Sequence, residues 1–160
     1  MSTGKHLWSL ANDVFDYLPY AASIDDVIFC VHGGIPRPLS LNECILNSIM
    51  EIPCPACFDS CRTNGHLEEL KRLSSDLLWS DPIDEEKGAY LDESGFGKGE
   101  RGDGVCYGDK AVENFLHQTG MSFVIRAHEP TQKGISVSNK GRVISVFSTS
   151  RVSFLCWFDK

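Results

Sequence analysis

Three short, predominantly apolar runs, each closed by polar or turn-forming residues, constrain the fold of this chain more than any other feature. The runs span residues 27–31, 123–127 and 143–147. The five consecutive apolar residues of the first run predict a strand that is buried on both faces, and the other two runs predict strands as well. The three strands end on His32, His128 and Ser148. Because ligands gather at the carboxyl ends of strands in such sheets, we expect the functional site near these residues.

Helical patterns separate the predicted strands. Residues 7–18 place apolar side chains at i, i+3, i+4, i+7, i+8 and i+11, the spacing of an amphipathic helix. Further helices are expected over residues 41–50, over residues 66–73 and from Asp109, as its N-cap, to a stop near Gly120. The order of helices and strands predicts an α+β fold in layers.

Length and composition limit the classes of protein to be considered. The chain has 160 residues, 42% hydrophobic and 23% charged, which suits one globular domain. No apolar stretch is long enough to cross a bilayer, and no apolar signal core follows the N-terminus, so we expect a cytoplasmic protein, with a nuclear location also open. The formal net charge of −7 counts against nucleic acid as a partner, since phosphate contacts need clustered Lys and Arg.

Seven cysteines and no secretory signal favour reduced thiols over disulfides. One group, Cys54, Cys57, Cys61 and His66, has C-x2-C-x3-C-x4-H spacing, which supplies the four ligands of a tetrahedral zinc site. The spacing differs from that of standard zinc fingers and ribbons, so a loop of reduced thiols is the alternative.

Two strand-end histidines give the strongest chemical signal. A strand end fixes the rings of His32 and His128, which suits metal ligands or general acids; hydrogen-bonded structural histidines are the alternative. Residues 92–104 contain five glycines and predict a loop that carries Arg101. The guanidinium of Arg101 offers a planar fork to a phosphate group, and an exposed loop arginine is the alternative.

Four blocks of sequence resemble the phosphoprotein phosphatases, the serine/threonine phosphatases of the calcineurin-like metallophosphoesterase fold. The blocks, in the family's order, are Phe29–Pro36, Leu77–Pro82, Arg101-Gly102 with Tyr107-Gly108 following, and Ile125–Glu129. The resemblance implies that residues 1–150 form the C-terminal half of a metallophosphoesterase domain. The full domain is a β-sandwich flanked by helices, in four αββα layers, and residues 151–160 form a divergent tail.

The resemblance also implies a site and its cofactors. Family members bind two divalent metal ions of the Mn, Fe or Zn type, which activate water and neutralise charge on the phosphoryl group of a phosphoprotein substrate. By position, His32 and His128 match metal ligands and Arg101 matches a residue that binds phosphate. Trp79 and Asp81 match residues that shape the substrate groove.

The family's first half is absent from this sequence. The blocks G-D-x-H-G, G-D-x-x-D-R-G and G-N-H-E, which supply the remaining ligands and the histidine proton donor, do not occur. We therefore expect a fragment or truncated isoform of an enzyme that hydrolyses phosphoserine and phosphothreonine. Alone it would have a weak, partial metal site, no catalytic residue that can be assigned, and no activity. The alternative is a noncatalytic interaction protein that binds phosphatase regulatory subunits.

Overall fold

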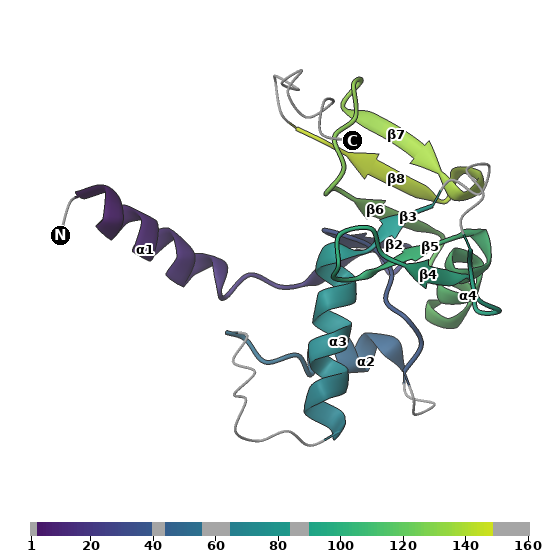
Figure 1. The fold of residues 1–160 in the computed structure, drawn as a ribbon, viewed down its shortest axis with the longest axis horizontal. Coiled ribbons are helices and arrows are strands. Elements are labelled where there is room, and N and C mark those ends of the chain that lie inside the picture. The colour runs from purple at the N-terminus through teal and green to yellow at the C-terminus, as the bar shows by residue number, and fades with distance from the viewer. Residues whose placement is uncertain (1–2, 40–43, 56–64, 84–89, 149–160) are drawn as a thin grey trace.

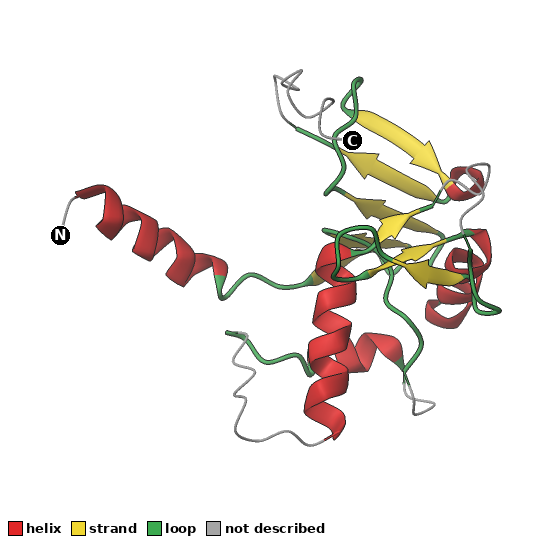
Figure 2. Cartoon of the chain, viewed as in Figure 1, coloured by secondary structure: helices red, strands yellow, loops and turns green. Residues whose placement is uncertain are grey.

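The structure is a computed structural model, and it describes residues 3–39, 44–55, 65–83 and 90–148. Within these ranges the chain forms two sheets and four α-helices (Figure 1, Figure 2). The helices are α1 Thr3–Phe15, α2 Ile45–Met50, α3 Gly65–Trp79 and α4 Asp109–Thr119. The strands are β1 Ala21–Ile24, β2 Ile28–Val31, β3 Asp81–Pro82, β4 Phe96–Lys98, β5 Val105–Tyr107, β6 Phe123–Arg126, β7 Ile135–Ser138 and β8 Val143–Val146. A 3-10 turn, η2, spans Asn139–Gly141. These elements confirm the predicted mixture of helices and sheets.

The larger sheet has five strands in the order β1-β2-β6-β8-β7. Its three central strands, β2, β6 and β8, are parallel and correspond to the three predicted strands. The edge strands β1 and β7 pair antiparallel with their neighbours and were not predicted. Both contain serine and lack a long apolar run, so their sequences give a weak strand signal.

The helices confirm the predicted segments with shifted bounds. α3 runs on to Trp79, well beyond the predicted end at residue 73, because Leu70, Leu73 and Leu77 form one buried stripe along it. α4 has Gly108 rather than Asp109 as its N-cap, and Asp109 is its first helical residue. The predicted stop at Gly120 is confirmed, since this residue takes the left-handed conformation, with φ 72°, that glycine adopts without strain.

Two further expectations need correction. The glycine-rich segment 92–104 is not all loop, because β4 lies within it and pairs with β5 in the three-stranded sheet β3-β5-β4. The amphipathic segment 7–18 is helical only to Phe15, and the helix buries none of its side chains. Figure 1 shows α1 extending away from the rest of the described chain. None of the helices in the described ranges is long and apolar enough to span a membrane.

The core lies on one face of the five-stranded sheet. Phe29, Val31, Val124 and Val143 point to this face and are buried in one cluster with residues of α3, α4 and the smaller sheet. The ring of Phe29 contacts that of Phe115 in α4, with ring centroids 4.9 Å apart. The expectation that residues 27–31 are buried on both faces is wrong for this structure. Within β2 only alternate residues are buried, because the described elements cover a single face.

Candidate metal and phosphate site

The structure brings the two strand-end histidines together. His32 follows β2 and His128 follows β6, and these neighbouring parallel strands end at the same edge of the sheet. Nδ1 of His128 lies 3.1 Å from Nε2 of His32. The two rings meet edge to face, with centroids 4.9 Å apart. Two imidazoles that are far apart in sequence thus converge on one point.

Backbone contacts fix both histidines. The amide of Ala127 donates a hydrogen bond to the carbonyl of His32, at 3.0 Å, and so ties the two strand ends together. His128 itself adopts a left-handed conformation with φ 64°, which is strained for a residue other than glycine. Gly33 lies against the backbone of Leu78, where a Cβ atom would collide. The glycine after His32 is therefore required by close packing against the end of α3.

Burial lowers the pKa of both imidazoles, which disfavours their charged forms. Desolvation lowers the pKa of His32 and that of His128, and the positive charge of Arg126 lowers both further. The ring of Trp79 packs edge-on against His128, with centroids 5.5 Å apart. Nε2 of His128 is buried without a hydrogen-bond partner among the described residues. The nitrogens that face each other are Nδ1 of His128 and Nε2 of His32, and a lowered pKa favours the uncharged imidazole that a metal ligand must be.

A buried arginine, which sequence reasoning missed, organises the surroundings of the histidines. Arg126 is 1% exposed and donates hydrogen bonds to the carbonyls of Gly33 and Ser80. Its guanidinium also pairs with Asp81, at 2.8 Å, and with Glu129, at 2.6 Å. The signal in the sequence was a single charged residue inside an apolar strand. Arg126 ties the loop after β2, strand β3 and the turn after β6 into one unit.

Asp81 connects the buried arginine to the exposed one. Its Oδ1 accepts a hydrogen bond from Arg126 and its Oδ2 accepts one from Nε of Arg101, at 2.9 Å. The side chain of Arg101 is 41% exposed, so it is accessible from solvent. Its charge also contributes, after desolvation, to the lowered pKa of His128. The predicted residues Arg101, Trp79 and Asp81 therefore lie in one neighbourhood with the histidines.

The described residues supply only part of a metal centre. No group of three or more His, Cys, Asp or Glu side chains in the described ranges is placed to hold a metal ion. His32 and His128 offer two ring nitrogens, and the carboxylate of Asp81, whose charge acts on both histidines, is engaged by two arginines. Hard divalent ions such as Mn²⁺ prefer oxygen ligands, which this pair lacks. The residues present therefore do not complete the two-metal centre that the resemblance implies.

Only two of the four residues of the predicted zinc site, Cys54 and His66, belong to the part of the chain that the structure describes. Cys54 is an exposed free thiol, and Nε2 of His66 lies 3.2 Å from a carboxylate oxygen of Glu51. Cys57 and Cys61 lie outside the described residues. The divergent tail, 151–160, also lies outside them. Zinc binding by this group stays a prediction.

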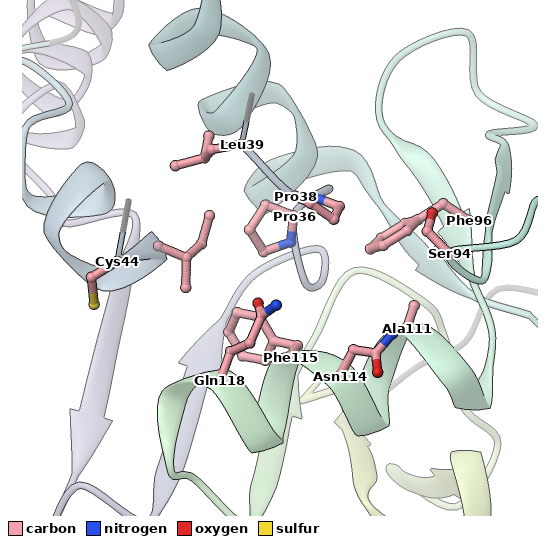
Figure 3. A pocket seen from close by; sticks show the side chains of 11 residues that line it. Pro36, Pro38, Leu39, Cys44, Ser94, Phe96, Ala111, Asn114, Phe115 and Gln118 are labelled. Atoms are coloured by element: carbon pink, nitrogen blue, oxygen red, sulfur yellow. The ribbon is translucent and has the colours of Figure 1, made fainter. Parts of the chain in front are cut away.

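A separate pocket of about 460 Å³ lies between the segment that follows His32 and helix α4. Figure 3 shows Pro36 and Pro38 across this pocket from Phe115 and Gln118 of α4. Its lining is mainly apolar and includes none of the site residues named above. The pocket was not predicted, because its walls come from stretches that are distant in sequence, residues 36–45, 94–96 and 111–118.

Comparison with known proteins defines the class. The calcineurin-like phosphoesterase family matches residues 2–132, and the chain belongs to that family. The structure is also similar to that of a protein serine/threonine phosphatase from Saccharomyces cerevisiae with similarity to human phosphatase PP5. The TM-score is 0.65 and the sequences are 24% identical; the match covers 92% of this chain and 39% of the yeast chain. At this identity the likeness shows a shared fold, and the chain spans well under half of the yeast protein.

Proposed function

We propose that this chain provides the C-terminal half of a metal-dependent protein serine/threonine phosphatase site and hydrolyses no phosphoester alone. The observation that carries the proposal is the convergence of His32 and His128 at 3.1 Å, at the ends of adjacent parallel strands. Membership of the calcineurin-like phosphoesterase family supports the hydrolase class. Phosphoserine and phosphothreonine in proteins are the proposed substrates, and residues 1–150 are the proposed extent of the partial domain.

Each residue has a distinct part in the proposed site. His32 and His128 present Nε2 and Nδ1 toward one point, as two ligands of one metal ion must. Arg101 binds phosphate oxygens through its guanidinium, which Asp81 holds at one nitrogen. Arg126 acts through Asp81 and is a positioning residue rather than a substrate contact. In the family, paired metal ions activate water and neutralise the phosphoryl group; this chain supplies only part of their ligand set.

A phosphopeptide assay tests both parts of the proposal. The 160-residue chain, with Mn²⁺ added, is expected to release no phosphate above the level of buffer. Sequencing the transcript across both ends then shows whether an upstream reading frame carries G-D-x-H-G and G-N-H-E. If it does, the extended protein is expected to hydrolyse the peptide, with activity lost in His128→Ala and kept in His117→Ala. Turnover by the 160-residue chain alone, abolished by His128→Ala, would contradict the expected inactivity.

The alternative function, binding of phosphatase regulatory subunits without catalysis, is supported by the large apolar surface of α1. Seven apolar residues of α1 and the turn after it are 47–71% exposed: Leu7, Trp8, Leu10, Val14, Phe15, Tyr17 and Leu18. Capture of a purified regulatory subunit by the chain, lost in Trp8→Ala, would favour this alternative. An extended protein that turns over phosphopeptide would favour the enzyme.

A further inference from the structure

The segment that begins with His32 is largely buried, although it belongs to no helix or strand. It follows β2 and spans residues 32–38, and we call it the His32 loop. Residues 33–36 of the loop are buried, and Ile35 is 0% exposed. A buried segment without regular secondary structure needs hydrogen-bond partners from other parts of the chain. The contacts that hold the His32 loop therefore also determine where the imidazole of His32 lies.

The last turn of α3 holds the His32 loop near both of its ends. Near the start of the loop, the amide of Gly33 donates a hydrogen bond to the carbonyl of Leu77, at 2.8 Å. Near its end, Arg37 donates three hydrogen bonds to the carboxylate of Asp76. The backbone amide, Nε and Nη2 of Arg37 lie 3.1, 2.9 and 2.7 Å from the carboxylate oxygens. Because Asp76 and Leu77 are consecutive, one turn of one helix fixes the loop at two points.

The carboxylate of Asp76 is fully buried, which makes its contact with the loop specific. Its side chain is 0% exposed, whereas that of Arg37 is 37% exposed. Both oxygens of Asp76 accept hydrogen bonds from the guanidinium of Arg37, a forked geometry that lysine cannot reproduce. Arg72, one turn earlier in α3, lies farther from the same carboxylate, at 3.8 Å. Since a buried ion pair adds little net stability, this one points to a role in fixing the position of the loop.

The same end of α3 also contacts the second histidine. Gly33 lies against the backbone of Leu78, and the ring of Trp79 packs edge-on against His128. Both histidines are therefore placed relative to the end of α3, one through the loop and the other through an aromatic contact. A shift of the loop along α3 would move His32 while His128 stayed against Trp79. The 3.1 Å separation of the two ring nitrogens thus depends on how the loop is held.

We propose that Asp76, acting through Arg37, is a positioning residue for His32. It holds the His32 loop on the end of α3, so that Nε2 of His32 stays opposite Nδ1 of His128. The proposal deepens the proposed function and rests on it for the role of the two histidines as metal ligands. Neither Asp76 nor Arg37 contacts substrate or metal. Loss of the contact leaves both imidazoles in the chain but removes their pre-organisation, which lowers affinity for any ligand that needs both.

The probe is copper(II)–iminodiacetate, an uncharged chelate that leaves coordination positions for two imidazoles. The chelate supplies the remaining ligands itself, so the 160-residue chain can be tested as it is. Imidazole suits Cu²⁺, and electron paramagnetic resonance distinguishes copper held by two imidazoles from copper held by one. A titration gives the affinity for the form with two imidazoles. His128→Ala sets the background level from single histidines, which include His6, His66 and His117.

Three variants separate positioning from stability. Arg37→Met removes the fork, and Arg37→Lys keeps the charge without the two parallel hydrogen bonds. Val143→Ala lowers stability from within the core, at a residue that belongs neither to the His32 loop nor to α3. Affinity for the chelate is expected to fall about tenfold with Arg37→Met and less with Arg37→Lys, and to stay within about twofold with Val143→Ala. Urea midpoints show that each variant is folded during the titration.

The outcomes separate this proposal from the proposed function. Unchanged affinity in Arg37→Met would overturn the positioning role and leave the histidine pair intact. A loss in Val143→Ala as large as that in Arg37→Met would also overturn it, because the effect would then follow stability. If the parent chain held copper through one imidazole only, the metal-ligand role of the pair would fail and the proposal with it. Where Arg37→Met does not fold, Arg37→Lys carries the same comparison.

Discussion

The two faces of the five-stranded sheet are built from the same strands and have opposite environments. On one face, the covered face, Phe29, Val124 and Val143 are 0–2% exposed and belong to the core. On the other face, the open face, Val137 and Val146 are 61% and 40% exposed, although they come from the same sheet. The strands therefore carry apolar side chains on both faces of the sheet, and the described chain covers only one of these faces.

This difference shows where stability and function reside in the chain. The covered face holds the fold together and carries Arg126, whose contacts position the histidine loops. The open face contributes little to the stability of the isolated chain, because burial is what makes an apolar side chain stabilising. Three predictions test this contrast, from the largest expected effect to the smallest.

The largest effect is expected for Arg126 on the covered face. Arg126→Met leaves Glu129 and the carbonyls of Gly33 and Ser80 without their donor. Because Glu129 is 40% exposed, we expect a cost of about 3 kcal/mol, the lower end for a broken buried ion pair. Arg101→Met removes an exposed partner of the same Asp81 and is expected to cost less than about 1 kcal/mol. Urea unfolding of both variants measures the difference. Equal losses of unfolding free energy would show that the buried Arg126 contributes no more to the network around Asp81 than the exposed Arg101 does.

Two valines on strand β8 give the most direct comparison of the faces. Val143 is 0% exposed and Val146 is 40% exposed, and each is changed to alanine. Val143→Ala is expected to lower the free energy of unfolding by about 2 kcal/mol, since it removes buried methyl groups and leaves a cavity. Val146→Ala is expected to change it by less than about 0.5 kcal/mol. A loss at Val146 as large as that at Val143 would mean that the open face is covered in the isolated chain.

The smallest effect on stability, with a clear effect on solubility, is expected for the edge strand β7. The double variant Ile135→Thr, Val137→Thr removes apolar surface from an unpaired sheet edge while keeping β-branched side chains. Its unfolding free energy is expected to stay within about 0.5 kcal/mol of the parent chain. Light scattering at rising concentration is expected to show less aggregation. Unchanged aggregation would indicate that another surface, such as α1, drives self-association.

Much of the fold and the centre of the candidate site follow from local sequence patterns. Residues 27–31, 123–127 and 143–147 predicted the three central strands, and the histidines that follow two of them lie together as their strand ends suggested. Those predictions succeed because parallel strands end at one edge of a sheet. The role of His32, His128 and Arg101 in binding metal and phosphate stays a prediction.

The features of the fold and the site that were not predicted depend on contacts between segments that are distant in sequence. Arg126 draws its partners from residues 3 to 93 positions away, so no window of sequence reveals its network. Strands β1 and β7 contain serine and lack a long apolar run, so they are set by pairing with their neighbours rather than by apolar content. The open face could be identified only from the register of all five strands. A continuous apolar run does not show which of the two faces of its strand is covered within the same chain.

Metal content tests the central claim most directly, because the account makes metal binding depend on ligands that the 160 residues lack. The 160-residue chain and the extended protein that carries G-D-x-H-G and G-N-H-E are each purified with Mn²⁺ present, desalted and analysed by elemental mass spectrometry. The account predicts about two ions per extended protein, well under one per 160-residue chain, and a fall in the extended protein with His128→Ala but not with His117→Ala. Two tightly held ions in the 160-residue chain, or an extended protein whose metal content does not change with His128→Ala, would contradict it.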